Sequence, residues 1–319
     1  MKIVILDGFA ANPGDLSWKG FSRFGEVTCY PRTSQQDLLD RAAGADVLFT
    51  NKTVLNRQAI QSLPQLKMIG VLATGYNIVD IEAARERGIP VCNVPAYSTD
   101  SVAQLIFAFL LQHANHVYEH TRSVQRGDWA SSLDFSYMVA PQTELAGKTI
   151  GFVGFGHVAQ KTADIAAAFG MRVIANSRTM KGQEDREGFQ WVGLDELCAE
   201  SDYISINCPL TSQTEGLVNR DFLLKMKPSA MLINTSRGPV VVEQDLADAL
   251  NHGVIAAAAV DVLSAEPPQA NNPLLSARNI YFTPHIGWAT KEARVRLLQI
   301  AEENLEAFVN GCPQNVVNL

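Results

Sequence analysis

Short apolar runs alternate with amphipathic segments along the first part of the chain. Runs of four or five residues rich in β-branched side chains are typical of buried parallel strands, and the segments between them follow the helical period. The predicted strands are Ile3–Leu6, Val27–Tyr30, Val47–Thr50, Met68–Leu72 and Val91–Val94, and the predicted helices are Leu38–Ala43, Asn56–Ser62 and Ile81–Arg87. This alternation indicates an α/β domain with a doubly wound parallel sheet in residues 1–98.

A long apolar segment follows from Thr99 and continues with helical spacing to about Arg126. It is apolar nearly all round, so we expect one helix that is buried on most sides and contributes to a subunit interface. His113, His116 and His120 share one face of this predicted helix. Carboxylate and cysteine side chains that would complete a metal site are missing from the pattern, so a packing role is expected and no metal is predicted. Residues 130–147 read as an irregular arm.

A βαβ unit begins at Thr149 and is followed by a second series of strands and helices. An apolar strand leads into Gly154-Phe155-Gly156-His157-Val158-Ala159, a G-x-G-x-x-G/A turn, and then into a helix that Gly170 ends before the strand Met171–Ala175. The glycines allow a tight turn and close approach of a pyrophosphate, which the helix N-terminus favours. The first domain has no such turn after its first strand, so we expect the dinucleotide to bind in the second.

The composition is that of a soluble globular protein, with 47% hydrophobic and 18% charged residues among 319. The net charge of -7 and the absence of a basic block argue against a nucleic-acid partner. The five cysteines lack metal-ligand spacing and are expected to be reduced thiols of a cytoplasmic protein. The N-terminal apolar run is too short for a signal peptide, and no run has the length of a membrane span, so no membrane partner is expected.

Three residues near the ends of strands suggest redox chemistry on a small acid. Arg237 follows the strand that begins at Met231, Glu266 follows the strand Ala256–Val262, and His285 ends the strand that begins at Ile280. An arginine binds a carboxylate with two parallel hydrogen bonds, and a histidine exchanges protons near neutral pH. A carboxylate next to the imidazole orients it and favours its protonated form. Each residue alone is more often structural, but their common placement in a dinucleotide fold favours a catalytic group.

A series of motifs carries a family resemblance over nearly the whole chain. The motifs are Ala73–Asp80, Asn93-Val94-Pro95, Ser101–Gln104, Gly154-Phe155-Gly156, Asn234–Gly238, Asp261–Pro267 and Pro284–Trp288. With these motifs the chain resembles the D-isomer-specific 2-hydroxyacid dehydrogenases, in particular the glycerate dehydrogenase/hydroxypyruvate reductase branch. The resemblance implies a discontinuous, flavodoxin-like substrate domain (residues 1–98 and 288–319), a Rossmann NAD(P) domain (residues 99–287), and an active-site cleft between them. It also implies a homodimer through the cofactor domain.

The resemblance implies a role for individual residues as well. His285 is the expected acid/base, Glu266 its partner and Arg237 the substrate anchor. The other expected substrate residues are Lys52, Ala73, Thr74, Gly75, Tyr76 and Trp288. For Lys52 the alternative is a solvated charge on a loop, and the sequence leaves both roles open. The expected cofactor residues are Thr74, Gly154, Gly156, His157, Val158, Ser177, Arg178, Cys208, Pro209, Thr214, Thr235, Ser236, Asp261 and Gly287.

Two positions depart from the usual family pattern. Ser177-Arg178 stands where an acidic residue commonly holds the ribose 2′-OH of NAD, and a hydroxyl with an arginine accommodates the 2′-phosphate of NADP. We therefore expect NADP(H) or NAD(H), with a preference for NADP(H). Gln104 replaces a common glutamate, which matches the glycerate-dehydrogenase-like branch.

Three functions remain open from the sequence. The first is reduction of hydroxypyruvate or glyoxylate to D-glycerate or glycolate, and its reverse. The second is a D-lactate-type or other D-2-hydroxyacid dehydrogenase, which would favour a more apolar pocket. The third is a dinucleotide-sensing corepressor, which the complete Arg-Glu-His group disfavours.

Overall fold

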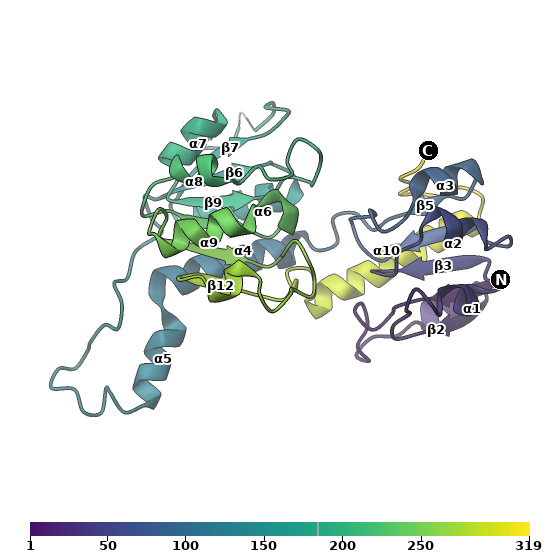
Figure 1. Cartoon of the computed structure of the whole chain (residues 1–319), viewed down its shortest axis with the longest axis horizontal. Helices are drawn as coiled ribbons and strands as arrows, with labels where there is room; N and C mark the ends of the chain where they lie inside the picture. The colour runs from purple at the N-terminus through teal and green to yellow at the C-terminus, as the bar shows by residue number, and fades with distance from the viewer. Residues whose placement is uncertain (184) are drawn as a thin grey trace. The chain divides into compact units, whose positions relative to one another are not determined.

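The computed structural model describes residues 1–183 and 185–319, and these form two compact units. The first unit joins Met1–Ser98 with Trp288–Leu319, and the second is the continuous stretch Thr99–Gly287. In Figure 1 the first unit therefore combines purple and blue elements with yellow ones. The second unit is an insertion in the sequence of the first. Assignment of the substrate to the first unit and of the cofactor to the second stays a prediction at this point.

The first unit is built on a five-stranded parallel sheet in the order β2-β1-β3-β4-β5. Its strands are β1 Lys2–Ile5, β2 Glu26–Cys29, β3 Val47–Thr50, β4 Met68–Val71 and β5 Val91–Cys92. This is the strand order of flavodoxin-like folds, in which ligands bind beyond the carboxyl ends of the strands. The doubly wound sheet predicted for this part of the chain is confirmed.

Alternate residues of these strands are buried on opposite faces of the sheet. One face packs on α1 Leu38–Ala42, α2 Arg57–Gln61 and α3 Ile81–Glu86. The other face packs on the 3₁₀ helix η1 Lys19–Arg23 and on α10 Lys291–Val309. Continuously apolar strands are expected where helices cover both faces of a parallel sheet.

Side-chain hydrogen bonds join the returning C-terminal segment to the first 98 residues. Asn304 Nδ2 donates to the carbonyl oxygen of Asn93 at 2.8 Å, and Asn318 Oδ1 accepts from the main-chain N–H of Val91 at 2.8 Å. The guanidinium of Arg294 forms an ion pair with Asp15, with an Nη1–Oδ1 distance of 2.7 Å. This ion pair holds the pKa of Asp15 below its ordinary value.

The second unit contains a seven-stranded parallel sheet in the order β12-β11-β10-β9-β6-β7-β8. Its strands are β6 Thr149–Val153, β7 Arg172–Asn176, β8 Phe189–Trp191, β9 Tyr203–Ile206, β10 Met231–Asn234, β11 Ala257–Val260 and β12 Ile280–Phe282. The order is that of a Rossmann sheet with one further strand beside β11. The strand order reverses beside β6, where Rossmann folds bind dinucleotides.

Helices cover both faces of this sheet as well. Its helices are α4 Thr99–Asn115, α5 Val117–Gln125, α6 His157–Ala168, α7 Leu194–Glu200, α8 Arg220–Leu224 and α9 Glu243–Asn251, with the short 3₁₀ helices η2 Gly238–Val240 and η3 Pro273–Ser276. The core on one face includes side chains of α4 and α6, and the core on the other includes side chains of α7, α8 and α9.

The prediction of one continuous helix from Thr99 to Arg126 is wrong. His116 adopts a left-handed conformation with φ of 50° and separates α4 from α5. A left-handed residue cannot continue a right-handed helix, so His113 and His120 lie in different helices and not on one face. The aligned apolar pattern does not reveal this break.

Two elements at the end of the chain differ from what the sequence pattern predicts. The pattern predicts a closing helix over residues 288–308, but α10 begins at Lys291, where Thr290 Oγ1 accepts from the main-chain N–H of Ala293. The pattern also predicts a tail strand at residues 316–318, but the structure has only an isolated bridge between Val316 and Cys92. Strand β8 was not predicted, because it has only three residues, of which the middle one is exposed, and these form no apolar run.

The cysteines are free thiols in the structure. Burial raises the pKa of Cys92 to about 11 and that of Cys198 to about 12, which disfavours the reactive thiolate at both positions. Among the helices described, none combines the length and the apolar character that crossing a membrane requires.

Gly70 provides a test of packing in the first sheet. It is paired with Phe49 on the neighbouring strand, and a Cβ added at Gly70 would lie 2.2 Å from Phe49 Cε1. Phe49 is buried and cannot move freely. We expect Gly70→Ala to destabilise the protein by about 1–3 kcal/mol, measured as a lower thermal unfolding midpoint. The double variant Gly70→Ala/Phe49→Leu should lose less free energy of unfolding than the two single variants lose together. Fully additive losses would contradict this packing.

Candidate active site

The residues predicted to bind the cofactor in the second unit lie beyond the carboxyl ends of its strands. Each of β6, β7, β9, β10, β11 and β12 is followed by at least one of them. Carboxyl ends of parallel strands share one edge of a sheet, so the topology gathers these loops along that edge. Thr74, in the first unit, is the exception.

The two glycines of the turn after β6 have different surroundings. Gly154 has φ of 87°, and a Cβ there would lie 2.7 Å from the main-chain nitrogen of Cys208. It is therefore needed for both its conformation and its contact with the loop after β9. A Cβ at Gly156 would meet no atom within 4 Å, so the space above this residue is open. Gly156 also precedes α6 without a side-chain cap, which leaves N–H groups of His157 and Val158 available to an anion.

Two buried polar atoms on loops at the same edge of the sheet suit a polar ligand. Thr235 Oγ1, after β10, and Asn207 Oδ1, after β9, have no hydrogen-bond partner among the described residues. Buried polar groups without a partner are costly, so atoms of this kind often bind a ligand. Together with the open turn at Gly156, they fit the polar groups of a dinucleotide.

The remaining predicted cofactor residues lie on neighbouring loops. Ser177 and the exposed Arg178 directly follow β7. Pro209 and Thr214 lie in the loop after β9, where Thr214 Oγ1 donates to the carbonyl oxygen of Pro209 at 2.6 Å. This bond closes the loop that follows Cys208.

Asn234 organises the turn that carries Arg237. Its Oδ1 accepts from the main-chain N–H of Ser236 at 3.0 Å and from Ser236 Oγ at 2.9 Å. Its Nδ2 donates to the carbonyl oxygen of Arg237 at 3.0 Å. Asn234 is buried at the end of β10, so these bonds fix the main chain of Arg237 to the sheet.

The loop that carries Glu266 lies directly against this turn. A Cβ at Gly238 would lie 2.0 Å from the carbonyl carbon of Leu263 and 2.3 Å from the nitrogen of Ser264. The close contact with main-chain atoms explains why glycine follows Arg237. The turn after β10 and the loop after β11 are therefore packed as one body.

Glu266 and His285 are in direct contact. The imidazole Nδ1 of His285 lies 2.6 Å from Glu266 Oε2, while Glu266 Oε1 accepts from the main-chain N–H of Leu263 at 3.1 Å. The pair is only partly buried, with 26% of the His285 side chain and 31% of the Glu266 side chain exposed. Because Nδ1 faces the carboxylate, Nε2 is the ring nitrogen left for a substrate.

Asp261 fixes the segment that contains His285. Its Oδ1 accepts from Thr283 Oγ1 at 2.6 Å and from the N–H of Ile286 at 2.8 Å, and its Oδ2 accepts from the N–H of Gly287 at 2.9 Å. The N–H of His285 donates to the carbonyl oxygen of Asp261 at 2.8 Å. Burial raises the pKa of Asp261, although the hydrogen bonds from Thr283, Gly287 and Ile286 act in the opposite direction.

The predicted substrate residues of the first unit lie after two adjacent strands and at the start of the returning segment. Lys52 follows β3 and is exposed, and Ala73–Tyr76 follows β4. The main-chain N–H groups of Thr74 and Gly75 donate to no acceptor in the described part of the chain, so they are available to a small anion. Trp288 packs on the core of this unit, with its ring 6.4 Å from that of Tyr97.

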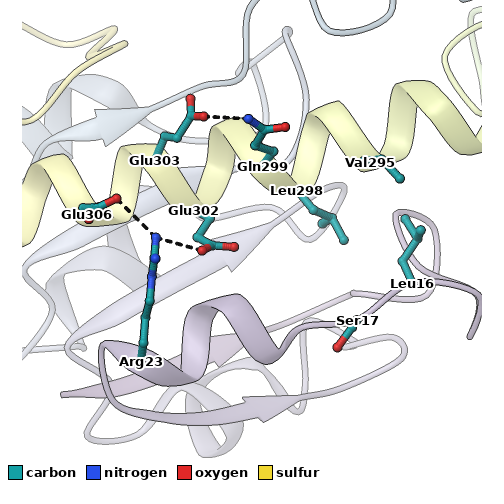
Figure 2. Close-up of a pocket in the computed structure, with 9 residues that line it drawn as sticks. All are labelled: Leu16, Ser17, Arg23, Val295, Leu298, Gln299, Glu302, Glu303 and Glu306. Atoms are coloured by element: carbon teal, nitrogen blue, oxygen red, sulfur yellow. Dashed lines mark hydrogen bonds and ion pairs between the residues drawn. The ribbon is translucent and has the colours of Figure 1, made fainter.

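A groove elsewhere in the first unit is not part of this group of residues. It lies between η1 and α10, has a volume of about 470 Å³, and contains Arg23 in ion pairs with Glu302 and Glu306 (Figure 2). None of the predicted site residues lines it. Its acidic side chains are unsuited to an organic acid, so we assign it no role in the chemistry.

Some residues that shape the site were not singled out from the sequence. Asn234 was quoted only as part of a motif, and Asn207, Thr283 and Glu243 were not considered for the site. Glu243 Oε1 accepts from the N–H of Ser264 at 2.7 Å and so supports the Glu266 loop. Their contacts join residues far apart in the chain, and only the position of Asn234 and Asn207 at strand ends could have indicated them.

Comparisons with known proteins identify the family of this chain. Residues 107–287 match the model of the D-isomer specific 2-hydroxyacid dehydrogenase NAD binding domain. A hydroxypyruvate reductase from Blautia hydrogenotrophica is 48% identical over the full length of both chains. A glyoxylate reductase from Thermococcus litoralis is 41% identical over 88% of this chain and 86% of its own.

A solved structure shows the same likeness in three dimensions. An acyclic imino acid reductase in complex with NADPH and D-Arg superposes with a TM-score of 0.87 at 29% identity, covering 99% of this chain and 100% of its own. The chain belongs to the D-isomer specific 2-hydroxyacid dehydrogenase family. The expected family and fold class are confirmed, and the protein is an oxidoreductase of 2-hydroxy acids that uses a nicotinamide dinucleotide. The predicted cleft between the two domains stays a prediction.

The contact between Glu266 and His285 leads to a prediction about catalysis. Glu266→Gln removes the carboxylate that holds Nδ1 of the imidazole, so reductase kcat should fall about tenfold or more. Glu243→Gln is the control, because that carboxylate supports the same loop without touching His285. Steady-state rates of the two variants and the wild type would show the difference. An equal loss of kcat in both variants would mean that loop structure, and not the contact with His285, sets the rate.

Proposed function

We propose that this enzyme reduces hydroxypyruvate or glyoxylate to D-glycerate or glycolate with NAD(P)H, and also catalyses the reverse reactions. The observation that carries the proposal is the hydrogen bond of 2.6 Å between His285 Nδ1 and Glu266 Oε2, on a loop packed against the Arg237 turn. The packed loops carry Arg237, Glu266 and His285, the three groups proposed to act in the reduction of a 2-oxo acid. The identity of 48% to a hydroxypyruvate reductase supports this choice of substrate.

In this proposal His285 is the acid/base. During reduction its Nε2 donates a proton to the carbonyl oxygen of the substrate, and in the reverse direction it accepts that proton. Glu266 holds the opposite ring nitrogen, so the imidazole keeps one orientation. Bound NAD(P)H supplies the hydride that the substrate carbon receives.

Arg237 and the first unit are proposed to hold the acid. The guanidinium of Arg237 is suited to bind both the carboxylate and the carbonyl oxygen. The free N–H groups of Thr74 and Gly75 would bind the carboxylate, and Lys52, Tyr76 and Trp288 would contact the rest of the substrate. A lysine and an indole favour a hydroxylated acid of two or three carbons over the methyl group of a lactate-type substrate.

The cofactor would bind along the carboxyl edge of the second sheet. The turn from Gly154 to Val158 would hold the pyrophosphate, Thr235 would bind a polar group of the dinucleotide, and Asp261 would face the nicotinamide. Ser177 and Arg178 would bind the 2′-phosphate of NADP, and on this basis we propose a preference for NADP(H).

We also propose a homodimer through the second unit. Large apolar side chains are exposed on α5 and on the arm that follows it, including Tyr118 at 63%, Phe135 at 91% and Leu133 at 102%. Exposed apolar groups of this size commonly mark protein interfaces. All five cysteines are free thiols, as is usual in the reducing cytoplasm, and this supports a cytoplasmic location.

A panel of 2-oxo acids tests the proposed function directly. Rates of cofactor oxidation would be measured with hydroxypyruvate, glyoxylate, pyruvate and longer 2-oxo acids, using NADH and NADPH. We expect the highest kcat/KM with hydroxypyruvate or glyoxylate. A higher value with pyruvate would favour the D-lactate reading, and cofactor binding without turnover of any acid would favour the dinucleotide-sensing corepressor.

Arg178 allows a separate test of cofactor choice. Loss of a hydrogen-bonded charge on the 2′-phosphate should raise the KM of Arg178→Ala for NADPH by about tenfold or more, with little change for NADH. Arg172→Ala is the control, because Arg172 lies at the opposite end of β7 and pairs with Glu200. A wild type that strongly prefers NADH would overturn the proposed preference.

A further inference from the structure

Asp7 is a buried carboxylate at the carboxyl edge of the first sheet, with no role so far. It follows β1 by two residues, and 8% of its surface is exposed. Burial of a carboxylate is costly unless hydrogen bonds compensate for the lost water. The question is what these hydrogen bonds hold in place.

Among the described residues, the hydrogen-bond donors to this carboxylate all belong to the loop after β3. Asp7 Oδ1 accepts from the main-chain N–H of Asn51 at 2.7 Å. Its Oδ2 accepts from the N–H of Lys52 at 2.6 Å, from the N–H of Thr53 at 2.7 Å and from Thr53 Oγ1 at 3.1 Å. Three consecutive main-chain N–H groups therefore point inward to one carboxylate.

This arrangement decides which part of the loop can meet a ligand. Consecutive N–H groups often form an anion site, but here Asp7 already occupies them. The side chain of Lys52 is exposed, so the loop offers its ammonium group instead of its main chain. The turn at Thr74 and Gly75 differs, because its main-chain N–H groups donate to no acceptor in the described residues and can bind a ligand directly.

The Lys52 loop is also tied to the strand that leads into that turn. Asn51 Nδ2 donates to the carbonyl oxygen of Leu72 at 2.6 Å, and the N–H of Leu72 donates to the carbonyl oxygen of Thr50 at 2.8 Å. Thr50 Oγ1 donates to the carbonyl oxygen of Thr53 at 2.9 Å and closes the loop on itself. The main chain of Lys52 is therefore held in a fixed relation to Ala73, the residue after Leu72.

We propose that Asp7 is a positioning residue for substrate binding, which holds the loop 51–53 so that the Lys52 ammonium group and the Thr74–Gly75 turn bind the same acid. The inference rests on the substrate roles proposed above for Lys52 and this turn. A fixed main chain limits the entropy lost on binding to the rotamers of the lysine side chain. Asp7 should therefore affect the binding of the acid more than the proton transfer by His285.

The test begins with Asp7→Asn. The amide keeps one acceptor oxygen but turns an NH₂ group toward a main-chain donor, so at least one of the four hydrogen bonds is lost. We expect the KM for hydroxypyruvate to rise about tenfold or more, with kcat changed less than about threefold and the Kd for NADPH unchanged. If Asp7→Asn does not fold, Thr53→Val removes one hydrogen bond to Asp7 and should raise the same KM about two- to threefold.

A double-mutant cycle with Lys52→Met separates positioning from general structural support. If Asp7 acts through Lys52, adding Asp7→Asn to Lys52→Met should raise the KM by less than about twofold further. Asp46→Asn is the matched control. Asp46 lies at the opposite end of the sheet, where its carboxylate accepts from the N–H of Lys2 at 2.8 Å and from Lys67 Nζ at 2.7 Å. It should lower the thermal unfolding midpoint and leave the KM unchanged.

Two results would overturn the inference in an active enzyme. One is a KM that does not change in Asp7→Asn or, where that variant does not fold, in Thr53→Val. The other is a cycle in which the KM effects of Asp7→Asn and Lys52→Met multiply. A wild type that reduces no 2-oxo acid would instead overturn the proposed function, and the panel of acids above detects that outcome separately.

Discussion

Main-chain N–H groups that leave a parallel sheet at its carboxyl edge need acceptors, and a buried aspartate provides them in each unit. Asp261 accepts from the main chain of Ile286 and Gly287, and Asp7 accepts from three consecutive residues after β3. In the described part of the chain, the donors to both carboxylates are main-chain N–H groups and threonine hydroxyls of these loops. The loops that carry the candidate catalytic and substrate residues are therefore held by the sheets themselves.

The Arg237, Glu266 and His285 loops are further linked to one another. The glycine after Arg237 lets the main chain of Leu263 approach, Glu266 bonds back to Leu263, and its other oxygen meets His285. None of these contacts involves the flexible end of a long side chain except that of Glu266. The acid/base pair thus has a rigid support, as proton transfer over a short distance requires.

The sequence was sufficient to predict the family and the two parallel sheets, because both depend on local pattern or on short motifs. The same motifs single out Arg237, Glu266 and His285 as candidates. The sequence did not predict the break at His116, since the apolar positions continue in register through this left-handed residue. It also missed Asp7 and Asn234 as supports. Their partners are main-chain groups, which look alike in every sequence.

The insertion of the second unit into the first has a consequence for how the protein is made. The second unit is complete once Gly287 has been synthesised, and domains generally fold as units during synthesis. The first sheet is made earlier, but one of its faces is covered by η1 together with α10, which follows the second unit in the sequence. Ribosome-bound chains would therefore expose apolar side chains of that face until α10 has been synthesised.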